Sequence, residues 1–129
     1  MEAVKSGRVG SDRANVLETA LDYFEGWFDG NVERMDRALH PALAKRSLRQ
    51  VDPEMPELRS VTKEQMLAWT AAGEGRREDP GDRRIEVEVI DVHGNIATVL
   101  IRSAVYREYL HLVRTNEGWQ IVNALWRFA

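Results

Sequence analysis

The sequence predicts an α+β fold in which helices pack on one face of an antiparallel sheet. Up to about residue 72, apolar residues recur at the three- and four-residue intervals of amphipathic helices. From residue 84 the period changes to two, as in strands with one solvated face, and turn residues separate four such strands. Helices come first and strands follow, which is the segregated order of an α+β domain.

Size and composition are those of a single globular domain. The chain has 129 residues, 43% hydrophobic and 30% charged, with no cysteine for disulfides or thiolate metal sites. Its net charge of −3 gives no basic excess for nucleic acid. No apolar run reaches the ~18 residues that span a membrane, and no signal peptide is evident, so we expect a cytoplasmic protein. We expect residues 1–12 to be a flexible tail and residues 13–129 the domain.

Three helices are predicted from apolar spacing and capping residues, over residues 13–29, 32–39 and 62–72. Gly30 is the natural stop of the first helix. His40-Pro41 ends the second, because the residue before a proline disfavours helix. Thr62 and Gln65 form a capping box that opens the third.

Four strands are predicted in the second half, over residues 85–89, 96–102, 106–114 and 119–128. Gly94 lies in the turn between the first two strands, and Gly118 in the turn before the last. Earlier in the chain, residues 42–51 look like a short strand or an extended arm. Residues 52–60 contain two prolines and no periodicity, and residues 73–84 are polar, so both segments are predicted as loops.

Two tryptophans in the last strand, Trp119 and Trp126, are an odd number of residues apart. Side chains alternate between the faces of a strand, so this spacing points the two indoles to opposite sides. A single core covers only one of these sides. The spacing therefore predicts that a second surface covers the other.

Three stretches carry a resemblance to a known superfamily: LDYFEGWFDGNVERMDRALHPALAKRSL, GNIATVLI and YLHLVRTNEGWQIVNALW. Together with the order of elements, they resemble the cone-shaped α+β barrel of the nuclear transport factor 2-like superfamily, which includes ketosteroid isomerases and the SnoaL polyketide cyclase-like proteins. Within it, the match is nearest to the lumazine-binding-like group. The resemblance implies three helices on a curved antiparallel sheet, a pocket inside the cone and a homodimer through the sheet. The name of the group implies a pterin-like ligand.

The isomerase chemistry is expected not to carry over. The spacing of Tyr23 and Gly30 matches a tyrosine that the isomerases carry on their first helix. Ungapped counting from Gly30 places their aspartate base at Ser47, whose hydroxyl cannot replace a carboxylate near neutral pH. Their second acid falls at or near Tyr109. Two of three roles are therefore missing, which favours binding over isomerisation by that mechanism.

The first helix and the last strand supply four pocket candidates. Tyr23 either donates a hydrogen bond into a pocket or is a core tyrosine bonded to a backbone carbonyl. Trp27, one turn later on the same face, is either a stacking wall or simple packing. By the resemblance, Trp126 is the pocket residue of the last strand. Asn123 has the opposite parity and is the alternative that a β-bulge would turn inward.

The remaining pocket candidates are His40, Ser47, Tyr109 and His111. His40 either acts as an acid or base or only marks the end of a helix. Tyr109 and His111 share one face of a strand. If that face is concave, both line the cavity; if it is convex, both lie where subunits meet.

No metal or cofactor is predicted. The three histidines lack the spacing of a metal site, and no phosphate-binding glycine loop is found. Lys45, Arg46 and Arg49 form a small basic cluster. It either meets an anionic ligand or, more often for such clusters, is a solvated arm.

Two functions from different classes remain. In the first, an aromatic-lined pocket binds a small cyclic or aromatic molecule, and any catalysis is cofactor-independent isomerisation or dehydration. In the second, the protein is a non-enzymatic dimeric interaction module whose cone is filled by its own side chains. A cavity above roughly 300 Å³ favours the first. For the dimer, Trp119 and Ile121 are the interface candidates.

Overall fold

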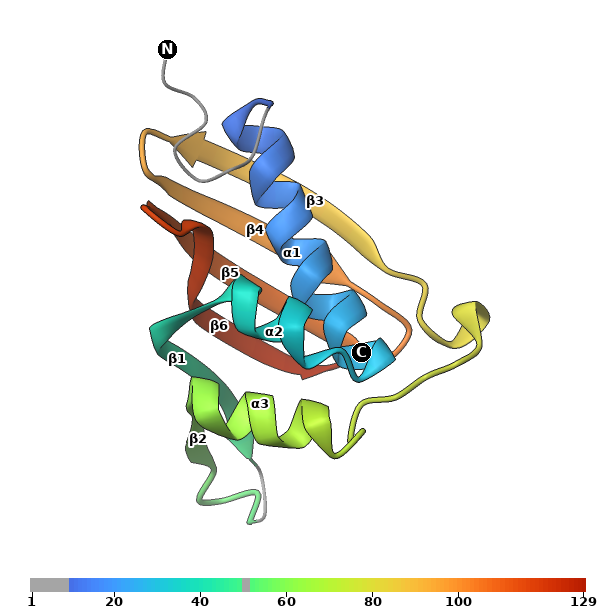
Figure 1. Ribbon diagram of the computed structural model, residues 1–129. Helices are drawn as coiled ribbons and strands as arrows, with labels where there is room; N and C mark the ends of the chain where they lie inside the picture. The colour runs from blue at the N-terminus through green and yellow to red at the C-terminus, as the bar shows by residue number, and fades with distance from the viewer. Residues whose placement is uncertain (1–9, 50–51) are drawn as a thin grey trace.

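The computed structural model describes residues 10–49 and 52–129. Three helices cover one face of a six-stranded sheet with strand order β2-β1-β6-β5-β4-β3 (Figure 1). The helices are α1 (Asp12–Asp29), α2 (Val32–Ala38) and α3 (Lys63–Ala71), and a short 3-10 helix, η1, spans Pro80–Asp82. The strands are β1 (Leu39–Arg49), β2 (Glu57–Val61), β3 (Glu86–His93), β4 (Ile96–Arg102), β5 (Tyr106–Thr115) and β6 (Gly118–Phe128). The predicted α+β class, with three helices on a curved sheet, is confirmed.

Local capping fixes where the helices begin and end. The Ser11 side chain accepts a hydrogen bond from the Ala14 amide, so α1 begins at Asp12, inside the segment predicted as a tail. Residues 1–9 of that predicted tail lie outside the described residues. Gly30 ends α1 at φ 68°, a left-handed conformation that glycine adopts readily. Thr62 opens α3 through the predicted capping box.

The edge of the sheet formed by β1 and β2 differs from the prediction. β1 pairs with β6 in parallel, so the sheet is mixed rather than wholly antiparallel. β2 pairs with β1 and lies largely within the segment 52–60 that was predicted as a loop. Four of the five residues of β2 are exposed. An exposed edge strand shows no alternation of apolar and polar residues, which is the signal that sequence analysis depends on.

A β-bulge at Val122 decides which side chains of β6 point toward the helices. Leu112 of β5 faces Ile121, and His111 faces Asn123, so Val122 is left without a partner. The extra residue shifts the alternation of side chains by one position from there on. The residues of β6 that face the helices therefore have odd numbers before the bulge and even numbers after it.

Because of this bulge, Trp119 and Trp126 both point toward the helices, and the prediction that they point to opposite faces is wrong. Trp119 is 3% exposed and Ile121 is 0% exposed. The Trp119 indole Nε1 donates to Asp12 Oδ1 over 3.1 Å, and its carbonyl accepts from Thr19 Oγ1 over 3.1 Å. Trp119 and Ile121 are thus core residues of the chain and are not available for contact with a second copy of the sheet.

The hydrophobic core lies between the helices and the concave face of the sheet (Figure 1). Its large, fully buried side chains come from α1, α2 and four strands, and include Phe28, Met35, Leu39, Ile101, Leu110, Leu112 and Ile121. None of the helices in the described part of the chain is long and apolar enough to cross a membrane.

Candidate functional site

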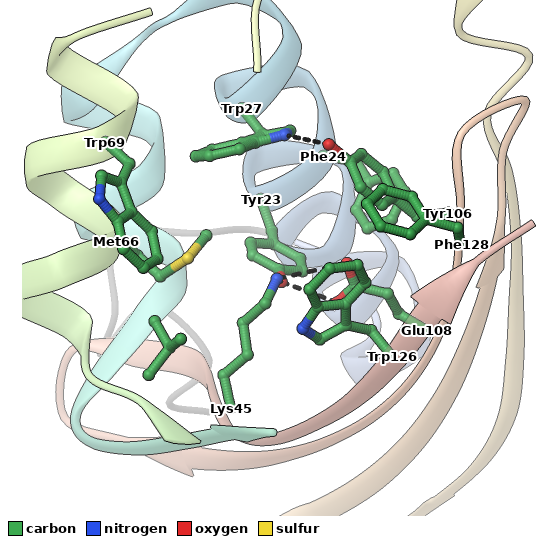
Figure 2. Close-up of a pocket in the computed structure, with 11 residues that line it drawn as sticks. Tyr23, Phe24, Trp27, Lys45, Met66, Trp69, Tyr106, Glu108, Trp126 and Phe128 are labelled. Carbon is green, nitrogen blue, oxygen red and sulfur yellow. Dashed lines mark hydrogen bonds and ion pairs between the residues drawn. The ribbon is translucent and has the colours of Figure 1, made fainter. Parts of the chain in front are cut away.

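The helices and the concave face of the sheet enclose a cavity of about 110 Å³ (Figure 2). Most of its wall is aromatic and is formed by Tyr23, Phe24, Trp27, Trp69, Tyr106, Trp126 and Phe128. Val61 and Met66 add apolar surface, while Lys45 and Glu108 are its charged residues. The cavity therefore combines an apolar wall with a few converging polar groups. Its volume is smaller than the roughly 300 Å³ typical of ligand pockets.

Three ionisable side chains meet at this cavity, and we call them the Lys45–Tyr23–Glu108 cluster (Figure 2). The Tyr23 hydroxyl donates to Glu108 Oε1 over 2.7 Å. Lys45 Nζ donates to the Tyr23 oxygen and lies 3.3 Å from Glu108 Oε2. All three residues are buried, with exposed fractions of 1% for Tyr23, 7% for Lys45 and 2% for Glu108. Each charged group thus has a charged or hydrogen-bonding partner, as burial requires.

The register of the sheet places Lys45 and Glu108 on the same face. Glu108 lies opposite Trp126 on β6, and Lys45 lies beside Ala124 on the other edge of β6. Both positions have the parity that faces the helices, where α1 presents Tyr23. The cluster is therefore assembled from one helix and two strands that are far apart in the sequence.

Burial perturbs the ionisation of the cluster. Loss of solvent lowers the pKa of Lys45, because a buried ammonium is less stable than a hydrated one, and the Glu108 carboxylate offsets part of this effect. Burial raises the pKa of Tyr23 well above its usual value, and the charge of Glu108 raises it further. A lysine of lowered pKa can exchange a proton with a ligand or attack a carbonyl, and the phenol can donate to an oxyanion.

Trp27 and Trp126 form opposite parts of the aromatic wall. Trp27 Nε1 donates to the Tyr106 hydroxyl over 3.1 Å. Gly75 packs against Trp27 so closely that a Cβ there would lie 2.1 Å from the indole, so the position of the ring depends on this glycine. Trp126 lies within 5.3 Å of Lys45 Nζ, measured to its ring centroid, and its buried Nε1 has no hydrogen-bond partner among the described residues.

The structure brings three of the predicted pocket residues into the cavity: Tyr23, Trp27 and Trp126. Tyr109, His111 and Asn123 lie on the opposite, convex face of the sheet, where Tyr109 is 48% exposed. Their prediction as cavity residues is wrong, because β5 presents Glu108 and Leu110 to the helices, and the bulge keeps Asn123 opposite His111.

The two other candidates lie in separate surface grooves. His40 lies in a groove with Lys63 and Gln120, and its Nδ1 accepts a hydrogen bond from the Ala42 amide over 2.9 Å. Ser47 lies beyond Lys45 near the end of β1, in a groove at the end of the sheet. Neither residue contacts the aromatic cavity.

Lys45 and Glu108 are the functional candidates that sequence analysis missed. Lys45 was assigned to a basic cluster that is more often solvated, yet it shares the parity of Leu43, which is buried. Glu108 shares the parity of Leu110 and Leu112, both buried. A charged residue in phase with buried leucines was the signal that could have identified both. Among the described residues, no group of three His, Cys, Asp or Glu side chains is arranged to hold a metal ion.

We expect the phenol of Tyr23 to remain protonated when the folded protein is titrated past pH 10. Because its pKa is raised on folding, its contribution to stability is present below the usual tyrosine pKa of 10.0 and is lost as pH rises above it. Tyrosinate absorbance measures this directly. Up to pH ~10.5, folded Tyr23→Phe and wild type should give the same curve. In guanidinium, the variant should lose the signal of one of three tyrosines. A loss of signal in the folded variant would contradict the burial of this phenol.

The helix-covered curved sheet and its enclosed aromatic cavity define the cone-shaped α+β class of nuclear transport factor 2-like (NTF2-like) proteins. The chain belongs to the family described as "Putative lumazine-binding", whose model matches residues 11–127. No curated protein matches the sequence.

Solved structures of the same class share this fold at low sequence identity. An NTF2-like protein of unknown function from Silicibacter pomeroyi is 14% identical, with a TM-score of 0.73 over 90% of this chain and 94% of its own. One from Shewanella baltica is 14% identical, with a TM-score of 0.68 over 90% and 92%. A cystatin-like fold protein from Burkholderia xenovorans is 20% identical, with a TM-score of 0.62 over 91% of both chains.

Proposed function

We propose that this chain binds a small cyclic or aromatic molecule in the aromatic cavity, with a polar edge of the ligand against the Lys45–Tyr23–Glu108 cluster. One observation carries the proposal: a buried lysine, tyrosine and glutamate converge on a cavity whose wall is otherwise aromatic. For stability alone, such a buried ion pair is often no better than well-packed apolar residues. Ionisable groups with perturbed pKa values in a cavity are more typical of binding and catalytic sites.

The family description suggests a pterin as the ligand. A flat ring would stack on Trp27 or Trp126, and a ring carbonyl would accept a hydrogen bond from Lys45. The unpartnered Nε1 of Trp126 offers a further donor. A two-ring pterin needs more room than about 110 Å³, so its entry requires side chains to move. Trp69 and Phe128, 36% and 62% exposed, are the lining residues best placed to move.

If the site also catalyses a reaction, the cluster sets its class. Lys45 and Glu108 would exchange protons with the ligand, and Tyr23 would donate to an oxygen that gains negative charge. These roles suit a cofactor-independent isomerisation or dehydration. The aspartate base of the isomerases has no counterpart at Ser47, so Lys45 or Glu108 would have to accept the proton instead.

The small cavity favours a second candidate, a non-enzymatic interaction module whose cone is filled by its own rings. In either case we propose a homodimer through the convex face of the sheet. The support is the exposed apolar surface there, where Ile96 of β4 is 53% exposed. Light scattering tests the dimer: a particle at the 14.8 kDa of one chain, even at high concentration, would exclude it.

A thermal-shift screen with lumazine, riboflavin, a steroid and aromatic acids tests the binding function. A ligand at about 100 times its Kd should stabilise the folded protein by about 2.7 kcal/mol, which raises the melting temperature by several degrees. Lys45→Met should reduce or abolish this ligand-induced rise. Arg77→Gln, which changes one charge on an exposed loop, should keep it. If no compound shifts the wild-type protein at saturating concentration, the binding function is wrong and the closed module remains.

A further inference from the structure

A second hollow, of about 670 Å³, lies where β1 and β6 separate. The two strands pair in parallel only as far as Arg46 and Leu125. Beyond that point β1 continues to Arg49 along β2, and β6 continues to Phe128 along β5. Side chains from four strands therefore line the hollow, and its volume lies within the ~300–1,000 Å³ range of small-molecule sites.

Four arginines line this hollow, which we call the arginine groove: Arg49, Arg59, Arg107 and Arg127. No acidic side chain is among the described residues that line it. This concentration of positive charge occurs in a chain whose net charge is −3. The potential in the groove is therefore a local feature and does not follow from composition.

Arg107 and Arg127 lie directly opposite each other on β5 and β6. Like charges in this arrangement destabilise a sheet. Arg102, next in the same row, has the Glu88 carboxylate 3.1 Å away. By contrast, Arg107, Arg49 and Arg59 have no ion pair with any described residue. The arrangement is costly in isolation and becomes favourable when an anion lies between the guanidinium groups.

The groove also has apolar walls. Tyr109, Leu125 and Phe128 line it and are 48%, 53% and 62% exposed. Guanidinium groups bind carboxylate and phosphate oxygens in pairs, and an aromatic or aliphatic body can lie against such walls. The groove thus matches an anion that carries an apolar body.

We propose that the arginine groove binds a small organic anion, a carboxylate or phosphate monoester with an aromatic body. The site is separate from the aromatic cavity, although Trp126 and Phe128 line both. A second copy of this chain fits the groove less well, because a two-fold contact centred there would bring arginines together.

Titration calorimetry with phenyl phosphate and benzoate tests the site, with inorganic phosphate and phenol as probes that each lack one part. At least one aromatic anion should bind, and more tightly than either partial probe. If phenyl phosphate is the tighter ligand, the groove recognises a phosphate group. If benzoate is tighter, it recognises a carboxylate. Arg107→Gln and Arg127→Gln should each weaken binding about tenfold, as expected for a lost charge-assisted hydrogen bond. Arg77→Gln has the same charge change outside the groove and should bind as wild type does.

Melting temperatures of the same variants show whether they are folded. Neither groove variant should melt lower than wild type, because each relieves a like-charge pair. Equal affinity in the groove variants and wild type would place the ligand elsewhere and overturn the proposal. Equal binding of phenol would also overturn it, since the arginines would then play no part. A third outcome would also overturn the proposal: neither aromatic anion binds, and light scattering shows a dimer that the groove variants disrupt. The groove would then be a contact with a second copy of this chain.

Discussion

Replacing Glu108 by glutamine is expected to lower the free energy of unfolding by about 3–5 kcal/mol at neutral pH. The amide oxygen can still accept from the Tyr23 hydroxyl, so the hydrogen bond is preserved. The Lys45 ammonium, 7% exposed, would lose its only carboxylate among the described residues. Burial then lowers the pKa of Lys45 without opposition. The lost stability should return as pH rises toward 10.5, where the unfolded lysine also loses its proton. Urea denaturation across this pH range measures both effects.

The double variant Lys45→Met, Glu108→Gln is the matched control. Methionine fills a similar volume without charge, so the pair is removed together rather than broken. We expect the double variant to recover most of the stability lost in either single variant, which gives a large coupling energy in a double-mutant cycle. If the two single losses simply add, Lys45 and Glu108 do not stabilise each other in the folded protein.

Trp119→Ala is expected to destabilise the single subunit by about 3–5 kcal/mol, as for other buried aromatic residues. The indole is 3% exposed and donates to Asp12 near the start of α1, so its loss leaves a cavity and removes one hydrogen bond from a carboxylate that keeps its ion pair with Arg114. The loss should not depend on protein concentration. Tyr109→Ala, on the convex face, should change the stability of the subunit by less than about 1 kcal/mol. A Trp119→Ala protein that keeps its stability but loses self-association would instead make Trp119 an interface residue.

The features predicted correctly depend on residues that are close in sequence. Gly30 ends α1 and Thr62 opens α3 because a left-handed glycine and a capping box are encoded within a few residues. Strands β3 to β6 could be predicted from the sequence, because apolar and polar residues alternate along them or turn residues mark where one strand ends and the next begins. β2 was not visible, because an exposed edge strand is held by pairing with β1 rather than by a buried face of its own.

The candidate site was predicted in part, for similar reasons. Tyr23 and Trp27 could be placed because helical spacing fixes the face they share. The inward positions of β5 and β1 depend on register across the sheet, and ungapped counting reached Tyr109 and Ser47. Glu108 is one residue before Tyr109, and Lys45 is two before Ser47. Because a strand alternates, an offset of one changes the face, whereas an offset of two keeps the parity but moves the residue along the strand.

The bulge at Val122 introduces a phase slip into the alternation of side chains along β6. On either side of this residue the strand keeps a period of two, but the two halves are out of step by half a cycle. A substitution at Val122 leaves the slip in place. Deleting Val122 would remove the slip but keep Trp126 on the concave side and Leu125 on the convex side, because Ile121 and Asn123 already lie opposite the consecutive residues Leu112 and His111. The pairing of β6 with β5 therefore sets which of its side chains face the helices, and the parity of residue numbers along β6 alone does not.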